Sequence, residues 1–174
     1  PIPAFSVVLD GQIIGYTKDI KPIDISIKQF KDELEQDYKM DVSFTQSIEY
    51  FVTAVDEGQL ADINTINKQL KASMDVKVEG IAIVIDGRET VIVKDRTTAH
   101  SIIEEIKAPY KQVSEDAQLK EIKLAEDVQF KDKLVPYEMV EDREDAYKLI
   151  AVGTEQQKPY EVQDGDTLWS IVKK

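Results

Sequence analysis

The chain has 174 residues, enough for one substantial domain or two small ones. Its formal net charge of −12 argues against nucleic-acid binding, which requires a basic surface, and against adsorption to an anionic membrane. It has no cysteine, and no apolar run reaches the roughly 20 residues that cross a bilayer, so we expect neither disulfides nor direct membrane insertion.

The first predicted element is a β-hairpin that turns at Asp10-Gly11, because this pair supplies the positive φ values of a tight two-residue turn. The chain begins at Pro1 without an initiator methionine, so we interpret it as an excised fragment or a processed product. After the hairpin, Lys21-Pro22 breaks the strand. Apolar residues at helical spacing then predict a helix over about residues 24–38, capped by Asp24 or Ser26.

Residues 42–52 alternate between apolar and polar side chains and predict a strand with a bend or bulge near Gln46-Ser47. A turn at residues 56–58 follows. The spacing of Ile63, Ile66 and Leu70 then predicts a short helix that ends before Met74. A strand from residue 75 to 78 leads directly into a second hairpin, which turns at Asp86-Gly87.

The second hairpin lies 76 residues after the first, and the elements that follow it repeat the earlier order. Thr97 and Thr98 replace the proline-containing start of the first helix, and Pro109 is expected to weaken the end of the second. Longer loops move the offset to 80 and then 84, so that Val128, Ala146 and Val162 match Ile48, Ile66 and Val78. We therefore predict a tandem duplication.

The predicted fold class is α+β, with two β-β-α-β-α-β units built from antiparallel sheets that carry helices on one face. The first unit is expected at residues 1–79 and the second at 80–158. No flexible linker separates them, which favours a stiff junction near Gly80.

The chain ends in a third segment, residues 159–174, whose pattern is Tyr-x-Val-x-x-Gly-Asp-Thr-Leu-Trp-x-Ile. It resembles the opening of a LysM module, the peptidoglycan-binding repeat, and it supplies about a third of such a module. The matching residues are Tyr160, Val162, Gly165, Asp166, Thr167, Leu168, Trp169 and Ile171, with Val172 where the family more often has alanine. The resemblance implies that Gly165, Asp166, Thr167 and Leu168 form part of the glycan-binding loop of a completed module.

The tandem units followed by this segment are also similar to the N-terminal extracellular region of Gram-positive cell-wall hydrolases. That similarity implies an extracytoplasmic location and a downstream zinc endopeptidase of the M23 type. Such a zinc site needs several histidines, and this chain has only His100. We therefore expect no catalytic, cofactor or metal site in this chain, with zinc only in a downstream domain.

The acidic runs of the chain are the other candidates for chemistry, and they fall on predicted helix faces or helix starts, where solvation and the helix dipole explain them. Together with this, the resemblance to cell-wall hydrolases implies a non-catalytic extracellular spacer or interaction region that positions or regulates the downstream modules. The alternative is a module that itself binds peptidoglycan or a protein. The expected partners are peptidoglycan, through the completed LysM module, and a protein or a second copy of the chain at sheet edges, including those beside Lys18-Asp19 and Lys94-Asp95.

Overall fold

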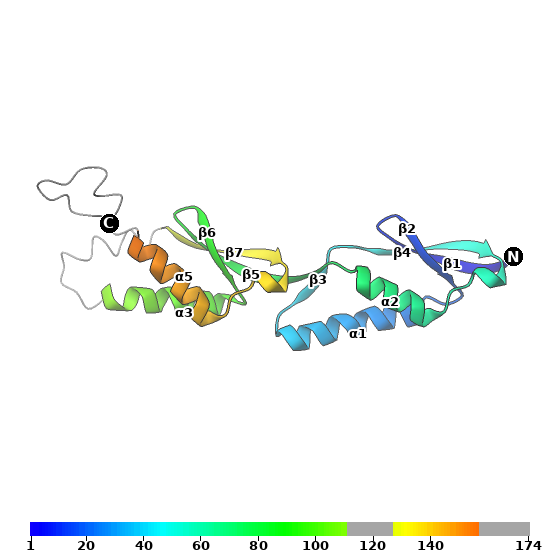
Figure 1. Cartoon of the computed structure of the whole chain (residues 1–174), viewed down its shortest axis with the longest axis horizontal. Coiled ribbons are helices and arrows are strands. Elements are labelled where there is room, and N and C mark those ends of the chain that lie inside the picture. The colour runs from blue at the N-terminus through cyan, green and yellow to red at the C-terminus, as the bar shows by residue number, and fades with distance from the viewer. Residues whose placement is uncertain (111–126, 157–174) are drawn as a thin grey trace, which may run out of the picture. The chain divides into compact units, whose positions relative to one another are not determined.

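The computed structural model describes residues 1–110 and 127–156 and has the predicted α+β architecture with antiparallel sheets (Figure 1). Three short 3₁₀ helices, η1 (Glu57–Gln59), η2 (Ala108–Tyr110) and η4 (Tyr137–Met139), follow longer elements. The strands and α-helices are β1 (Ile2–Leu9), β2 (Gln12–Thr17), α1 (Lys21–Tyr38), β3 (Val42–Phe44), β4 (Ile48–Val55), α2 (Ile63–Ser73), β5 (Val76–Ile85), β6 (Arg88–Val93), α3 (Arg96–Lys107), β7 (Val128–Val135) and α5 (Arg143–Gln156).

Both hairpins have the two-residue turn that the Asp-Gly pairs predict. The φ angles are 50° and 77° at Asp10 and Gly11, and 51° and 77° at Asp86 and Gly87. Two successive positive φ values match the right-handed twist of the flanking strands, which is why this turn closes tight hairpins. The turn prediction is confirmed in both repeats of the predicted duplication. We call residues 1–79 the first copy and residues 80–158 the second copy.

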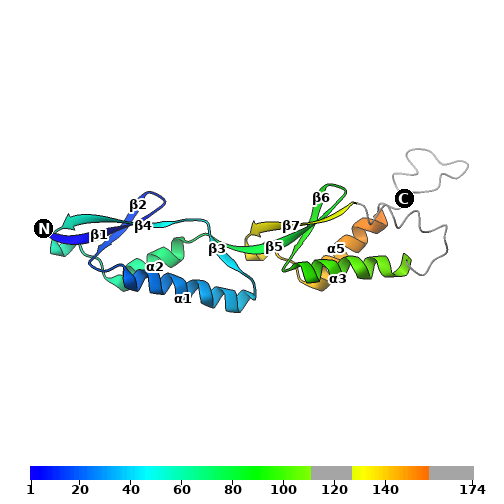
Figure 2. The same ribbon diagram turned by 180° about the vertical axis from the view of Figure 1, so that it is seen from behind.

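The first copy has a three-stranded antiparallel sheet in the order β2-β1-β4, with α1 and α2 on one face (Figure 2). The central strand directs Val7 and Leu9 toward the helices, where they pack with Ile23 of α1 and with Ile66 and Leu70 of α2. Burying each of these side chains contributes roughly 1.5–3 kcal/mol relative to exposure. This apolar layer is the core of the first copy.

The second copy repeats the layer at matched positions. Ile83, Ala99, Ala146 and Ile150 are buried where the first copy has Val7, Ile23, Ile66 and Leu70. A backbone contact is repeated as well: the N–H of Ala61 donates to the carbonyl of Tyr16 at 3.0 Å, and that of Glu141 donates to Ile92 at 2.8 Å. The predicted tandem duplication is therefore confirmed in the described residues.

One packing position differs between the copies in a compensated way. A Cβ atom at Gly15 would lie 3.1 Å from Ile66, so the glycine leaves room for the larger helix residue. The second copy has Val91 at the glycine position and Ala146 at the isoleucine position. The large and small partners are exchanged between strand and helix, which keeps the layer filled in both copies.

The helix predicted from about residue 24 begins earlier, and the caps predicted for both helices are wrong. Helix α1 begins at Lys21, and Pro22 lies in its first turn, where no backbone N–H is needed. Asp19 Oδ1 accepts a hydrogen bond from the N–H of Lys21 at 3.0 Å, and the matched Asp95 accepts one from Thr98 at 2.7 Å. The N-cap of α1 is thus Ile20, without a capping side chain, and not Asp24 or Ser26, whereas the N-cap of α3 is Asp95 and not the threonines.

The strand predicted over residues 42–52 is two strands that belong to different sheets. The break falls at the expected place, but β3 pairs with the start of β5, whereas β4 pairs with β1. The side chain of Gln46 donates to the carbonyl of Ser73 at 2.7 Å and accepts from the N–H of Asp75 at 2.5 Å. These bonds fix the connection from α2 to β5, which local alternation of residues does not report.

The chain divides into two compact units. Within the described residues, unit 1 comprises 1–82 and 131–140, and unit 2 comprises 83–110, 127–130 and 141–156. The divisions fall within β5 and close to the middle of β7, so both strands contribute to both units. The boundary expected between residues 79 and 80 stays a prediction, and residues 159–174 lie outside the described part of the chain.

We expect Gly15→Val to lower the free energy of unfolding by about 1–3 kcal/mol, since the new side chain would overlap Ile66. Ile66→Ala alone should cost about 2–5 kcal/mol because it leaves a cavity. The double variant reproduces the pair found in the second copy and should be clearly more stable than the sum of the single effects. Urea unfolding measures all three variants, and strict additivity would contradict exchange of volume between these positions.

The cap of α3 should make stability depend on pH. The hydrogen bonds that Thr98 donates from its side chain and backbone hold the pKa of Asp95 below its usual range. A depressed pKa in the folded state stabilises the protein above the unfolded pKa of about 3.9, and this stability is lost as the pH falls through the folded value. Asp95→Ala should cost about 1 kcal/mol at pH 7, and the difference from wild type should shrink below about pH 4. Urea unfolding across pH tests this, with Glu33→Ala on the exposed face of α1 as the control.

Candidate interaction surface

The only site residues predicted from the sequence, Gly165, Asp166, Thr167 and Leu168, lie outside the described residues. The described part of the chain contains no group of three or more histidine, aspartate or glutamate side chains that could hold a metal ion.

His100 is exposed on α3 and makes an edge-to-face contact with Phe130 of β7, with ring centroids 6.3 Å apart. The matched positions in the first copy are Asp24 and Tyr50, where the tyrosine hydroxyl donates to the carboxylate at 2.7 Å. Burial and this hydrogen bond raise the pKa of the Tyr50 phenol well above its usual value. Both pairs join the first turns of a helix to an edge strand, so the position of His100 has a packing role in both copies.

The acidic runs contribute to helix starts and helix contacts. Asp142 accepts a hydrogen bond from the N–H of Asp145 at 2.8 Å at the start of α5. Arg143 of α5 contacts Glu105 at 2.6 Å and Ser101 at 2.9 Å, both on α3. Asp86 and Asp127 form a pair, and the hydrogen bond between their carboxyls raises the pKa of Asp86. None of these contacts brings two carboxylates together in a buried site.

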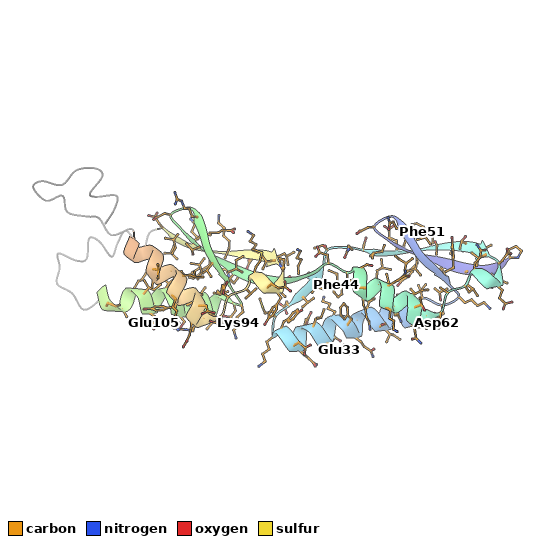
Figure 3. The ribbon with its side chains drawn as sticks, viewed as in Figure 1. Glu33, Phe44, Phe51, Asp62, Lys94 and Glu105 are labelled. Atoms are coloured by element: carbon orange, nitrogen blue, oxygen red, sulfur yellow. The ribbon has the colours of Figure 1, made fainter. Side chains whose placement is uncertain are left out.

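The face of the first sheet that points away from α1 and α2 is the clearest candidate surface. Residues paired across antiparallel strands share a face, and the pairing sets Phe51 and Tyr16 on either side of Ser6, and Glu49 and Ile13 on either side of Val8. Phe51 is 52% exposed and Ile13 is 56% exposed. Figure 3 shows Phe51 on the side of the sheet opposite to the helices.

The central residues of this face are covered by their neighbours and by no helix. Ala4, Ser6 and Val8 are 3%, 7% and 8% exposed. Tyr16 and Phe51 lie beside Ser6, and Ile13 lies beside Val8, so larger side chains on the flanking strands cover smaller ones on β1 and form the outer surface of the sheet. We call Ile13, Tyr16 and Phe51 the outer apolar face.

The second copy does not keep this surface. The positions of Ile13, Tyr16 and Phe51 are occupied by Glu89, Ile92 and Lys131, so two of the three residues are charged. The buried layers of the copies are alike, whereas their outer faces are different. The fold therefore does not require an apolar outer face, because the second copy has the same fold without one.

No protein-family model matches the chain, and no solved structure does either. The chain is similar to a protein of Caldicellulosiruptor saccharolyticus described as "Uncharacterized protein in xynC 3'region". The two are 27% identical over 169 residues, which covers 95% of this chain and 78% of that protein. The similarity therefore extends over both copies.

Sequence reasoning assigned the aromatic residues to core-like positions and so missed the outer apolar face. A position-by-position comparison of the two copies contains the signal, because Phe51 and Ile13 align with charged residues.

No helix in the described ranges is both long and apolar enough to cross a bilayer.

We expect Tyr50→Phe to lower the free energy of unfolding by about 1 kcal/mol, because it removes a hydrogen bond to a charged acceptor at a partly exposed site. Adding Asp24→His recreates the aromatic pair of the second copy and should recover part of the loss. Thermal and urea unfolding of the single and double variants measure the coupling. A double variant as unstable as the sum of its single changes would show that the two positions do not act as a pair.

Proposed function

We propose that this chain is a non-catalytic, extracytoplasmic spacer and interaction region of a peptidoglycan-associated cell-wall hydrolase in a Gram-positive bacterium. It would position or regulate a LysM module and an endopeptidase domain of the M23 type that follow it. The observation that carries the proposal is the combination of a duplicated scaffold with a C-terminal segment, Tyr160 to Ile171, that resembles the start of a LysM module.

A spacer needs no flexible linker between its copies, and the chain between the two hairpins contains regular elements instead. Strand β5 runs from its pairing with β3 into the second hairpin without a break. Unit 1 also includes residues 131–140, so the chain passes between the units at residues 82–83, 130–131 and 140–141. Within unit 1, Tyr137 stacks on Tyr38 with ring centroids 4.0 Å apart.

Zinc is expected only in the downstream domain, where the endopeptidase would supply the several histidines that bind it. His100 is the one histidine of this chain, and its ring contacts Phe130.

The outer apolar face favours the second candidate function, a module that binds peptidoglycan or a protein in its own right. Phe51 and Tyr16 present aromatic rings from the two strands that flank β1. Aromatic side chains give binding surfaces a large apolar area at low entropic cost.

Sedimentation with purified, insoluble peptidoglycan separates the two functions. We expect residues 1–158, which lack the LysM-like segment, to stay in the supernatant, since the spacer function assigns wall binding to the completed LysM module. Firm binding of residues 1–158 that Phe51→Lys abolishes would contradict the spacer and establish the second function. Zymography of the whole chain should show no clearing, and a cleared band would contradict a non-catalytic role.

A further inference from the structure

Strand β4 is an outermost strand of the first sheet within the described residues, because β1 pairs with it on one side only. It is eight residues long, and Glu49 is its one charged residue. Val52 is 81% exposed and Phe51 is 52% exposed. Uncharged edges of this length offer unpaired backbone groups to another strand, and proteins normally protect them.

The second copy contains that protection at the same positions. Lys131, Asp132 and Lys133 of β7 stand where β4 has Phe51, Val52 and Thr53. The burial of the two strands is otherwise the same from residue to residue. One fold in one chain therefore has a charged edge in one copy and an apolar edge in the other, so the apolar edge is not a requirement of the fold.

The free edges of β2 and β6, the second strands of the two hairpins, already accept backbone hydrogen bonds from other segments of the chain. The carbonyls of Tyr16 in β2 and Ile92 in β6 accept hydrogen bonds from Ala61 and Glu141. A register shift near Val7 and Val8 also interrupts the pairing of β1 with β2, and such irregularities discourage further pairing. The ends beside Lys18-Asp19 and Lys94-Asp95 are thus less suited to a partner strand than β4.

We propose that β4 pairs in antiparallel fashion with β4 of a second molecule of this protein. This pairing would join the three-stranded sheets of two molecules into one continuous sheet. The two-fold axis of such a dimer must pass between one residue of β4 and the same residue in the second molecule, because only then do directly opposed side chains share a face of the sheet. With the axis at Phe51, Phe51 lies opposite Phe51 of the second molecule, Tyr50 lies opposite Val52, and Glu49 lies opposite Thr53. With the axis at Val52, Phe51 faces Thr53 and Tyr50 faces Ala54. Neither register sets like charges opposite each other.

The same two axis positions are unfavourable in β7. An axis at Lys131 sets two lysines opposite each other, and an axis at Asp132 does so with two aspartates. Like charges directly opposite are destabilising in antiparallel pairs. At the matched positions β4 therefore suits self-pairing better than β7, because its only charged residue, Glu49, meets no like charge in either register.

This inference does not depend on the proposed function, because it concerns an edge of the folded first copy. One strand pair with its flanking side chains is smaller than a standard stable interface, so we expect a concentration-dependent equilibrium between monomer and dimer. The net charge of −12 makes two copies repel each other. Added salt screens this repulsion and should favour the dimer.

Sedimentation equilibrium of the whole chain over a range of concentrations tests the pairing. The double variant Phe51→Lys and Val52→Asp carries the residues of the second copy, so it should fold, and its dimer dissociation constant should rise about tenfold or more. Ile25→Ser is the matched control, because Ile25 is 59% exposed on α1 and the second copy has Ser101 there. It should dimerise as the wild type does. A wild-type chain that stays monomeric up to millimolar concentration in 0.5 M salt would overturn the proposal.

Cross-linking identifies the edge and the register, since the natural chain contains no cysteine. The separation of residues that oppose their own copies in antiparallel strands falls within the range that a disulfide spans. Either Phe51→Cys or Val52→Cys should form a disulfide-linked dimer under mild oxidation, and Lys131→Cys on β7 should do so much more slowly. Equal rates for all three variants would show that collisions at random, and not pairing of β4, bring the chains together.

Discussion

Each copy depends on one layer of apolar side chains between an antiparallel sheet, three-stranded in the first copy and four-stranded with β3 in the second, and two helices. A unit of about 80 residues has little other surface to bury, so this layer supplies most of its stability. Val7, Ile23, Ile66 and Leu70 fill it in the first copy, and Ile83, Ala99, Ala146 and Ile150 fill it in the second. The exchange of Gly15 and Ile66 for Val91 and Ala146 shows how strict the volume requirement is, because a large residue on one side accompanies a small one on the other.

Positions away from the layer differ more freely, and their differences are informative. At the margins of the layer, substitutions occur in pairs: Asp24 and Tyr50 correspond to His100 and Phe130, and both pairs join a helix to a strand. On the outer face and on the edge strand, the two copies differ in charge. There the first copy has Ile13, Phe51 and Val52, and the second has charged residues. Duplication thus provides an internal control that separates what the fold requires from what the first copy has in addition.

These differences connect the spacer function with the pairing of β4. A duplicated scaffold with an uninterrupted strand between its hairpins suits a region that holds neighbouring modules in place. Pairing of β4 with β4 of a second molecule would let the same scaffold bring two chains together. The second copy, whose edge is charged, would take no part in this pairing. The similarity to the protein of Caldicellulosiruptor saccharolyticus covers 95% of this chain, so it involves both copies and not one alone.

The sequence by itself determined the fold class, the two hairpins and the recurrence of elements after them. These depend on local signals, namely the Asp-Gly turns, the helical spacing and their recurrence 76 to 80 residues later. Only the tertiary structure showed that residues 42–52 divide between two sheets, because the Gln46 side chain bonds to Ser73 and Asp75 far along the chain. It likewise showed that Phe51 and Val52 are exposed, since alternation in a strand does not reveal which face the helices cover or which edge remains unpaired. Local pattern determines what an element is, whereas exposure depends on contacts between elements that lie far apart in the chain.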